Sequence, residues 1–291
     1  MKKIILLCLQ ILLTVSCSPK KESPSGKEIP TAHADSKPQI DVQMATEELK
    51  EYLDKPNPPE DIAPFIDSIK KEYPQLLADI AFLRSDSMKG VRIDCIGVTH
   101  FRAMEENNFE PSVDTETIAS QESARKQVLD SGYDLVSGDF SAYFGRVDKK
   151  IAIHEQLTNV SSMAKMLHYK KLPTYAETEK FLRDLATKDF PCSLAFSNSR
   201  KPYVIGTEPR WVYLTQQYLL PKFQSSPGMY PDIERFAWLL GRVRSEISYS
   251  RMAQYLLRNA KGQKGVLLYG ELHVPDYREF QNRFGTIGTI M

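Results

Sequence analysis

The sequence predicts an α/β fold, in which a mostly parallel sheet is flanked by helices and a helical or irregular insertion occupies the middle of the chain. Three apolar runs of strand length predict buried strands of a parallel sheet: 91–96, 133–140 and 265–269. Segments with helical periodicity lie between them. Strand, helix and strand joined by short connections form a βαβ unit, which favours parallel pairing.

The first half of the chain contains three expected helices. Apolar residues recur at spacings of three and four over 44–54 and over 62–84, and Pro58-Pro59 separates the two segments. A third helix is expected over about 116–129, and Ser131-Gly132 ends it before the second strand.

The second half begins with the insertion, expected over about 151–231. The chain looks helical from 151 to 190, whereas 191–204 is ambiguous and includes an expected strand over 192–196. Aromatic residues are interspersed with prolines over 207–230, which predicts irregular or helical structure that would cover a site. A long helix is expected from 232 to 257, directly before the last strand.

The N-terminus reads as a processing signal. Lys2 and Lys3 precede an apolar stretch over 4–13, which is too short for a stable membrane span. The residues Leu13-Thr14-Val15-Ser16-Cys17 resemble the lipobox of bacterial lipoproteins. This resemblance implies cleavage before Cys17, acylation of Cys17, and a lipid-anchored protein of the bacterial cell envelope. An ordinary secretory signal or an uncleaved anchor remains an alternative.

The chain after Cys17 divides into a tether and one domain. Residues 18–43 are rich in Ser, Pro, Lys and Glu, which predicts a disordered tether, and 44–291 would form a single α/β domain. Ser18 after the lipidated cysteine favours the outer membrane over the inner one. The chain has 38 basic and 37 acidic residues and no basic tract, which gives no reason to expect nucleic acid as a partner.

A Gly-x-x-His spacing occurs twice, each time after an apolar strand. The two copies are Gly97-Val98-Thr99-His100 and Gly270-Glu271-Leu272-His273. Open α/β sheets bind ligands at the carboxyl ends of their strands, so His100 and His273 are expected to converge there. A histidine at a strand end can equally be a hydrogen-bonded core or rim residue, and this alternative stays open.

Two acidic residues are expected at the same edge of the sheet. Glu271 lies two positions before His273, and Asp139 ends the second strand. Imidazole and carboxylate ligands suit a divalent transition metal of the zinc, manganese or cobalt type. One carboxylate would complete the metal site and the other would act as the general base. For Asp139, capping of the following turn is the alternative.

Arginines on the expected long helix are candidates for substrate binding. Arg244 and Arg251 precede the last strand, and either guanidinium would bind an anionic group of a substrate. For at least two of Arg242, Arg244 and Arg251, a solvated surface position is the alternative. Cys95 and Cys192 would be buried free thiols, with a disulfide as the alternative.

The pattern resembles the TraB/Tiki superfamily, which also includes ChaN-like haem-binding lipoproteins and, more distantly, the erythromycin esterases. The resemblance is carried by the two Gly-x-x-His motifs, by Asp139 at the position where the family has Glu, and by Met252-Ala253 before the last strand. The segment Ser250-Arg251-Met252-Ala253 keeps the Met-Ala pair but lacks an arginine at the offset where the family has it. The resemblance implies an α/β core with both histidine motifs at one pole.

The function implied by this resemblance is metal-dependent hydrolysis, with a peptide as the substrate in the Tiki branch. His100 and His273 would hold the ion in a lipoprotein anchored to the membrane. The alternative is a non-enzymatic protein similar to ChaN that binds haem, iron or another ligand, for which the aromatic segment 211–230 would supply an apolar surface.

Overall fold

The computed structural model confirms the α/β fold. It describes residues 45–71, 73–83, 85–99, 115–138, 145–155, 157, 174–187, 190–197, 202–209, 215, 219, 231–259, 264–270 and 273–291. The expected signal segment, Cys17 and the tether lie outside these residues. Within them, no helix combines the length and the apolar character needed to cross a membrane.

One five-stranded sheet forms the centre of the molecule, in the order β1-β5-β2-β4-β3. Four strands run parallel: β1 (Ile93–Val98), β5 (Gly265–Gly270), β2 (Leu135–Gly138) and β4 (Tyr203–Gly206). The short strand β3 (Gly145–Arg146) pairs antiparallel with β4 at one edge.

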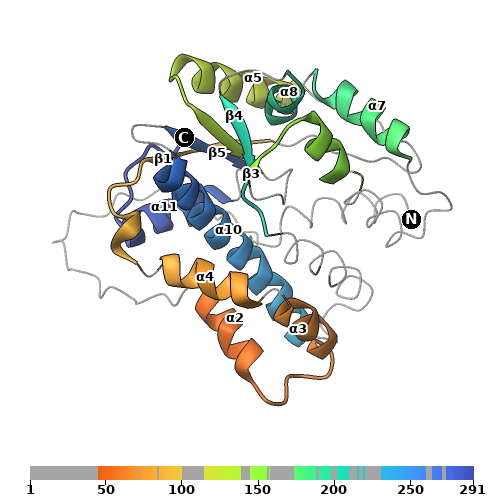
Figure 1. The fold of residues 1–291 in the computed structure, drawn as a ribbon, viewed down its shortest axis with the longest axis vertical. Coiled ribbons are helices and arrows are strands. Elements are labelled where there is room, and N and C mark those ends of the chain that lie inside the picture. The colour runs from red at the N-terminus through yellow and green to blue at the C-terminus, as the bar shows by residue number, and fades with distance from the viewer. Residues whose placement is uncertain are drawn as a thin grey trace, which may run out of the picture.

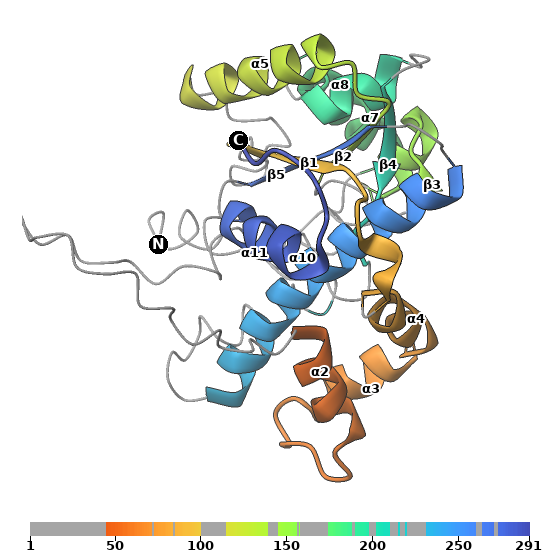
Figure 2. The same ribbon diagram turned by 90° about the vertical axis from the view of Figure 1, so that its left-hand side faces the viewer.

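Helices cover both faces of the sheet (Figure 2). On one face lie α5 (Thr115–Asp130) and α8 (Phe190–Ser197), and α7 (Tyr175–Leu185) packs against α8. On the other lie α10 (Pro231–Asn259) and α11 (Val274–Phe284). Successive strand residues point to opposite faces, so Leu267 packs toward α10 whereas Val266 and Leu268 pack toward α5.

Three shorter helices gather around one half of α10 (Figure 1). They are α2 (Ala45–Asp54), α3 (Ala63–Lys70) and α4 (Tyr73–Leu83), and they share a hydrophobic core with α10. The single helix expected over 62–84 is therefore two helices. Pro74 explains the break, because its ring would clash with the carbonyl group of Lys70 in a continuous helix.

The strand expected over 192–196 is wrong, because these residues belong to α8. A short apolar run has no periodicity that separates a buried strand from a buried helix. The fourth parallel strand, β4, instead follows a few residues later, in the ambiguous stretch. The long helix expected before the last strand is confirmed as α10.

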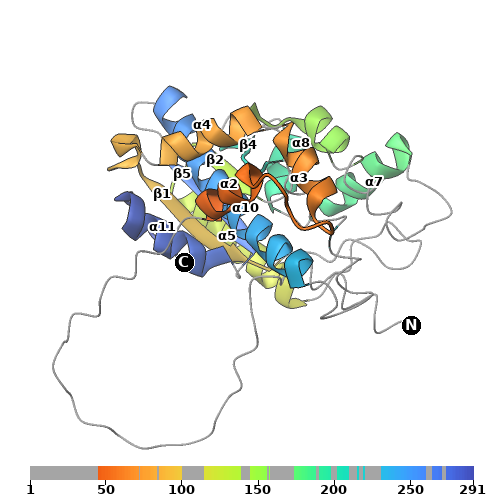
Figure 3. The same ribbon diagram turned by 90° about the horizontal axis from the view of Figure 1, so that it is seen from below.

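The segment after α11 pairs with the outer edge of β1. The backbone N–H groups of Ile93 and Cys95 donate to the carbonyl groups of Ile287 and Thr289 at 2.8 and 2.9 Å, and isolated parallel bridges join the two segments. Figure 3 shows α11 beside β1, and α11 contacts this strand. This segment therefore covers backbone groups that an edge strand would otherwise expose.

Candidate functional site

The two Gly-x-x-His motifs leave adjacent parallel strands at the same edge of the sheet. The register pairs Gly97 with Tyr269 and Val98 with Gly270, so the glycines that open the motifs are one position apart across the β1–β5 ladder. The strand β2 ends at this edge too, where Gly138 pairs with Leu268. His100, Asp139 and Glu271 lie outside the described residues.

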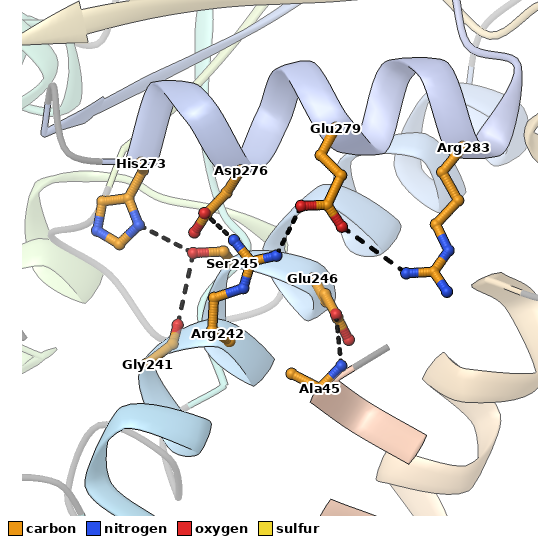
Figure 4. Close-up of polar contacts among 9 residues, drawn as sticks. All are labelled: Ala45, Gly241, Arg242, Ser245, Glu246, His273, Asp276, Glu279 and Arg283. Carbon is orange, nitrogen blue, oxygen red and sulfur yellow. Dashed lines mark hydrogen bonds and ion pairs between the residues drawn. The ribbon is translucent and has the colours of Figure 1, made fainter. Parts of the chain in front are cut away.

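His273 is the one predicted metal ligand that the described residues include, and it is buried. It stands directly before α11, with Pro275 in the first turn of that helix. Its Nδ1 atom lies 2.9 Å from the Oγ atom of Ser245 on α10. Figure 4 shows the ring pointing toward this hydroxyl. Its ring also meets the ring of Tyr269 edge-on, with centroids 5.7 Å apart.

A cross-helix ion pair fixes α11 against α10 close to His273 (Figure 4). Arg242 of α10 is in hydrogen-bond contact with Asp276, and its second nitrogen donates to Glu279 at 3.0 Å. The arginine and Asp276 side chains are 14% and 9% exposed, so the pair is largely shielded from water.

Buried hydroxyl groups connect three adjacent strands near the same edge. Ser137 of β2 and Thr207, just after β4, lie 2.8 Å apart, and Thr207 lies 3.0 Å from the hydroxyl of Tyr269 on β5. Burial raises the pKa of Tyr269, and the nearby Glu208 carboxylate adds to the rise. Tyr269 therefore remains a neutral hydroxyl that can donate or accept a hydrogen bond at physiological pH.

Arg244 makes a buried ion pair with Glu208, the residue after Thr207. Its Nε lies 2.6 Å from the Oε1 atom of this carboxylate, which Nη2 also contacts. Both side chains are almost fully buried.

Arg251 lies two turns farther along α10 and is also buried. Its Nη1 donates to the backbone carbonyl of Glu208 at 2.9 Å, and its Nε lies 3.4 Å from the carboxylate of Asp79 on α4. Burial raises the pKa of Asp79, and the charge of Arg251 opposes this rise.

For Arg242, Arg244 and Arg251 the alternative of a solvated surface position is wrong. Arg244 and Arg251 are each 6% exposed, and the Arg242 side chain is 14% exposed. Substrate binding by Arg244 or Arg251 stays a prediction. Sequence reasoning missed Glu208 and Asp79, the two carboxyl groups that meet these arginines. Neither lies in a motif, and only the fold brings them to α10.

The described part of the chain contains no group of three His, Cys, Asp or Glu side chains able to hold a metal ion. The proposed site includes three residues from outside that part, so the metal site stays a prediction. Cys95 and Cys192 are buried free thiols, which confirms the expectation and excludes a disulfide between them in this structure.

Comparison with protein-family models, with curated proteins and with solved structures finds no match to this chain. The resemblance to the TraB/Tiki superfamily therefore rests on the motif residues themselves.

Proposed function

We propose that this protein is a membrane-anchored lipoprotein whose α/β domain is a metal-dependent hydrolase similar to the TraB/Tiki group. The observation that carries the proposal is the pairing of β1 with β5. The adjacent parallel strands β1 and β5 lead into the two Gly-x-x-His motifs. In the register of this strand pair, Gly97 and Gly270 are offset by one position. Ligands bind at such carboxyl-terminal edges in α/β sheets.

The surroundings of His273 fit a metal ligand. A histidine that binds a metal through one ring nitrogen commonly engages its other nitrogen in a hydrogen bond that sets the ring orientation. His273 is buried, and its Nδ1 atom makes such a hydrogen bond with Ser245. His100 would supply the second imidazole, and Glu271 or Asp139 a carboxylate.

The chemistry proposed for the site is hydrolysis of a small-molecule or peptide substrate. A divalent ion of the zinc, manganese or cobalt type supplies Lewis acidity, which activates water at neutral pH and polarises the bond to be cleaved. The carboxylate of Glu271 or Asp139 that does not bind the ion accepts a proton from the attacking water. The neutral hydroxyl of Tyr269 lies beside His273 and can orient a polar group at this edge.

Metal content of the purified full-length chain tests the proposal. We expect about one transition metal ion per chain by elemental analysis, and loss of this ion when His100→Ala and His273→Ala are combined. His154→Ala is the matched control, since His154 is exposed and lies in a helical segment outside the motifs. Metal content that is unchanged in the double variant would refute the proposed site.

A haem titration separates the proposal from the alternative of a haem carrier. We expect no Soret band when haem is added to the full chain. A stoichiometric Soret band, together with unchanged metal content in the His100 and His273 variants, would favour haem binding instead. Failure of both metal and haem to bind would leave a scaffold without a cofactor.

A further inference from the structure

Ser245 contacts one of the two ring nitrogens of His273, Nδ1. We propose that Ser245 is a positioning residue that holds His273 in the tautomer protonated at Nδ1, so that Nε2 is the nitrogen presented to the metal. The assignment of Nε2 as a ligand rests on the proposed function. The tautomer is a property of the protein without any metal.

The two polar contacts of Ser245 favour one direction for its hydrogen bond with His273. Its Oγ atom lies 3.5 Å from the carbonyl oxygen of Gly241, one turn earlier in α10, and 2.9 Å from Nδ1 of His273. A serine hydroxyl has a single proton, and the Gly241 carbonyl can only accept. With that proton directed to Gly241, the Oγ atom accepts from an Nδ1–H group, and the lone pair of the neutral ring is on Nε2.

Ser245 lacks the accessibility of a nucleophile. Its relative exposure is 0%, and its hydroxyl lies between α10 and α11. A serine that attacks a substrate must face a cleft, with a base placed to remove its proton. The contact with His273 therefore indicates a supporting role and not a Ser–His nucleophile.

A second contact between the same two helices keeps the imidazole in place. Arg242 lies three residues before Ser245, and Asp276 lies three residues after His273, so the two contacts join the same faces of α10 and α11. A shift of α11 along α10 would therefore disturb both contacts together. The Arg242–Asp276 ion pair thus helps to hold α11 in the position from which His273 contacts Ser245.

The first experiment determines the tautomer in the metal-free full chain. The chain has 5 histidines, so histidine-selective ¹⁵N labelling gives a spectrum that His273→Gln can assign. At alkaline pH, where imidazoles are neutral, the ¹⁵N shifts distinguish Nδ1–H from Nε2–H. We expect Nδ1–H for His273 in the wild type, and a shift toward Nε2–H in Ser245→Ala.

Two variants separate positioning from general stability. Ser250→Ala removes another fully buried serine hydroxyl of α10, which accepts a hydrogen bond from Gln254 at 3.1 Å, and should leave the His273 tautomer unchanged. Ser245→Thr keeps the hydroxyl and should keep the Nδ1–H form. An Nε2–H ring in the wild type overturns the proposal, even if Ser245→Ala fails to fold.

The second experiment measures the affinity for zinc. Loss of a hydrogen bond behind a metal-bound histidine weakens metal binding by about 10- to 100-fold, which we expect for Ser245→Ala and not for Ser250→Ala. Equal affinities in both variants would overturn the positioning role while leaving the proposed function intact. An Nδ1–H ring in a chain that binds no metal would overturn the proposed function, and with it Nε2 as a ligand.

Discussion

Gly288 occupies a position where the backbone of the C-terminal segment approaches β1 too closely for a side chain. A Cβ atom built there would overlap the carbonyl group of Ile93 and would lie 2.7 Å from Nε2 of Gln281. This amide donates to the same carbonyl oxygen at 3.0 Å. The glycine is therefore required by close packing between two backbone segments.

The substitution Gly288→Ala should lower the free energy of unfolding by about 1–3 kcal/mol, because one segment must move to relieve the overlap. Urea denaturation followed by circular dichroism measures this loss. Ile287→Ala is the control, since Ile287 is 60% exposed and its replacement leaves the backbone pairing intact. A loss for Gly288→Ala no larger than that for the control would show that the segment adapts freely.

Asp94 is a polar residue inside β1 whose role became clear only in three dimensions. Its carboxylate accepts hydrogen bonds from the hydroxyl of Tyr133 and from the backbone N–H of Thr289, both at 2.6 Å. Burial raises the pKa of Tyr133, and its hydrogen bond to Asp94 adds to the rise. Asp94 thus connects β1 to the chain just before β2 and to the C-terminal segment.

At the scale of elements, α10 carries much of the polar network of the molecule. It is 29 residues long, and its middle third is buried although it contains charged and hydroxyl side chains. Each charged group there needs a partner, because an isolated buried charge is strongly unfavourable. The partners come from α2, α4, α11 and the segment after β4: Ala45, Asp79, Asp276 and Glu208.

Removal of the guanidinium from the α10–α11 pair should be costly. Arg242→Met leaves the buried carboxylate of Asp276 without its cationic partner, and we expect a loss of roughly 2–4 kcal/mol in the free energy of unfolding. Urea denaturation should show a smaller loss when Asp276→Asn is added to Arg242→Met. Equal losses in the single and double variants would contradict this coupling.

Lys50→Met is the control for the Arg242 variant. Lys50 and Asp54 form an exposed ion pair on α2, with side chains 38% and 50% exposed. Exposed pairs contribute about 0–1 kcal/mol, so this variant should unfold close to the wild type.

At the scale of the whole molecule, Glu246 links the α2–α4 helices to the central sheet through α10. Its two carboxylate oxygens accept from the backbone N–H groups of Ala45 and Thr46, at 2.7 and 2.8 Å, where α2 begins. A carboxylate at this end of a helix also interacts favourably with the helix dipole. Burial nevertheless raises the pKa of Glu246, and the hydrogen bonds from Thr46 and Ala45 oppose this rise.

Because its pKa is raised in the folded state, the Glu246 carboxyl group makes the free energy of unfolding depend on pH. The folded state binds its proton more tightly than the unfolded chain, so its contribution to stability is complete below the ordinary pKa of 4.5 and decreases as pH rises through the folded pKa. Glu246→Gln removes the titration. Relative to the wild type, the variant should therefore gain stability as pH rises from 4.5 toward neutrality.

Urea denaturation over this pH range measures the difference. Glu179→Gln is a control with a different pH window, since a hydrogen bond from Lys149 holds the pKa of the partly exposed Glu179 below its usual range. The contribution of Glu179 to stability is therefore essentially complete above its ordinary pKa of 4.5, and that variant should keep a nearly constant difference from the wild type as pH rises from 4.5 toward neutrality. A pH-independent difference for Glu246→Gln would show that this carboxyl group does not titrate in the range.

The local sequence was sufficient to predict the fold class and the elements with a strong periodic signal. Three of the four parallel strands and the long helix before the last strand follow from apolar runs and helical periodicity, because burial of a face imposes a repeat on the residues that form it. It also located both Gly-x-x-His motifs at strand ends. Local patterns did not separate α8 from a strand, since a short apolar run fits either.

The partners of His273 and of the buried arginines could be identified only from the folded chain. Ser245 lies 28 positions away in sequence, and Glu208 lies 36 positions from Arg244, so no local pattern connects either pair. The arginines looked like surface residues because a charged side chain is normally solvated. In the folded chain, carboxylates that are distant in sequence pair with these arginines and offset the cost of burying their charges. This pairing depends on the order of the strands and on the packing of α10 across the sheet.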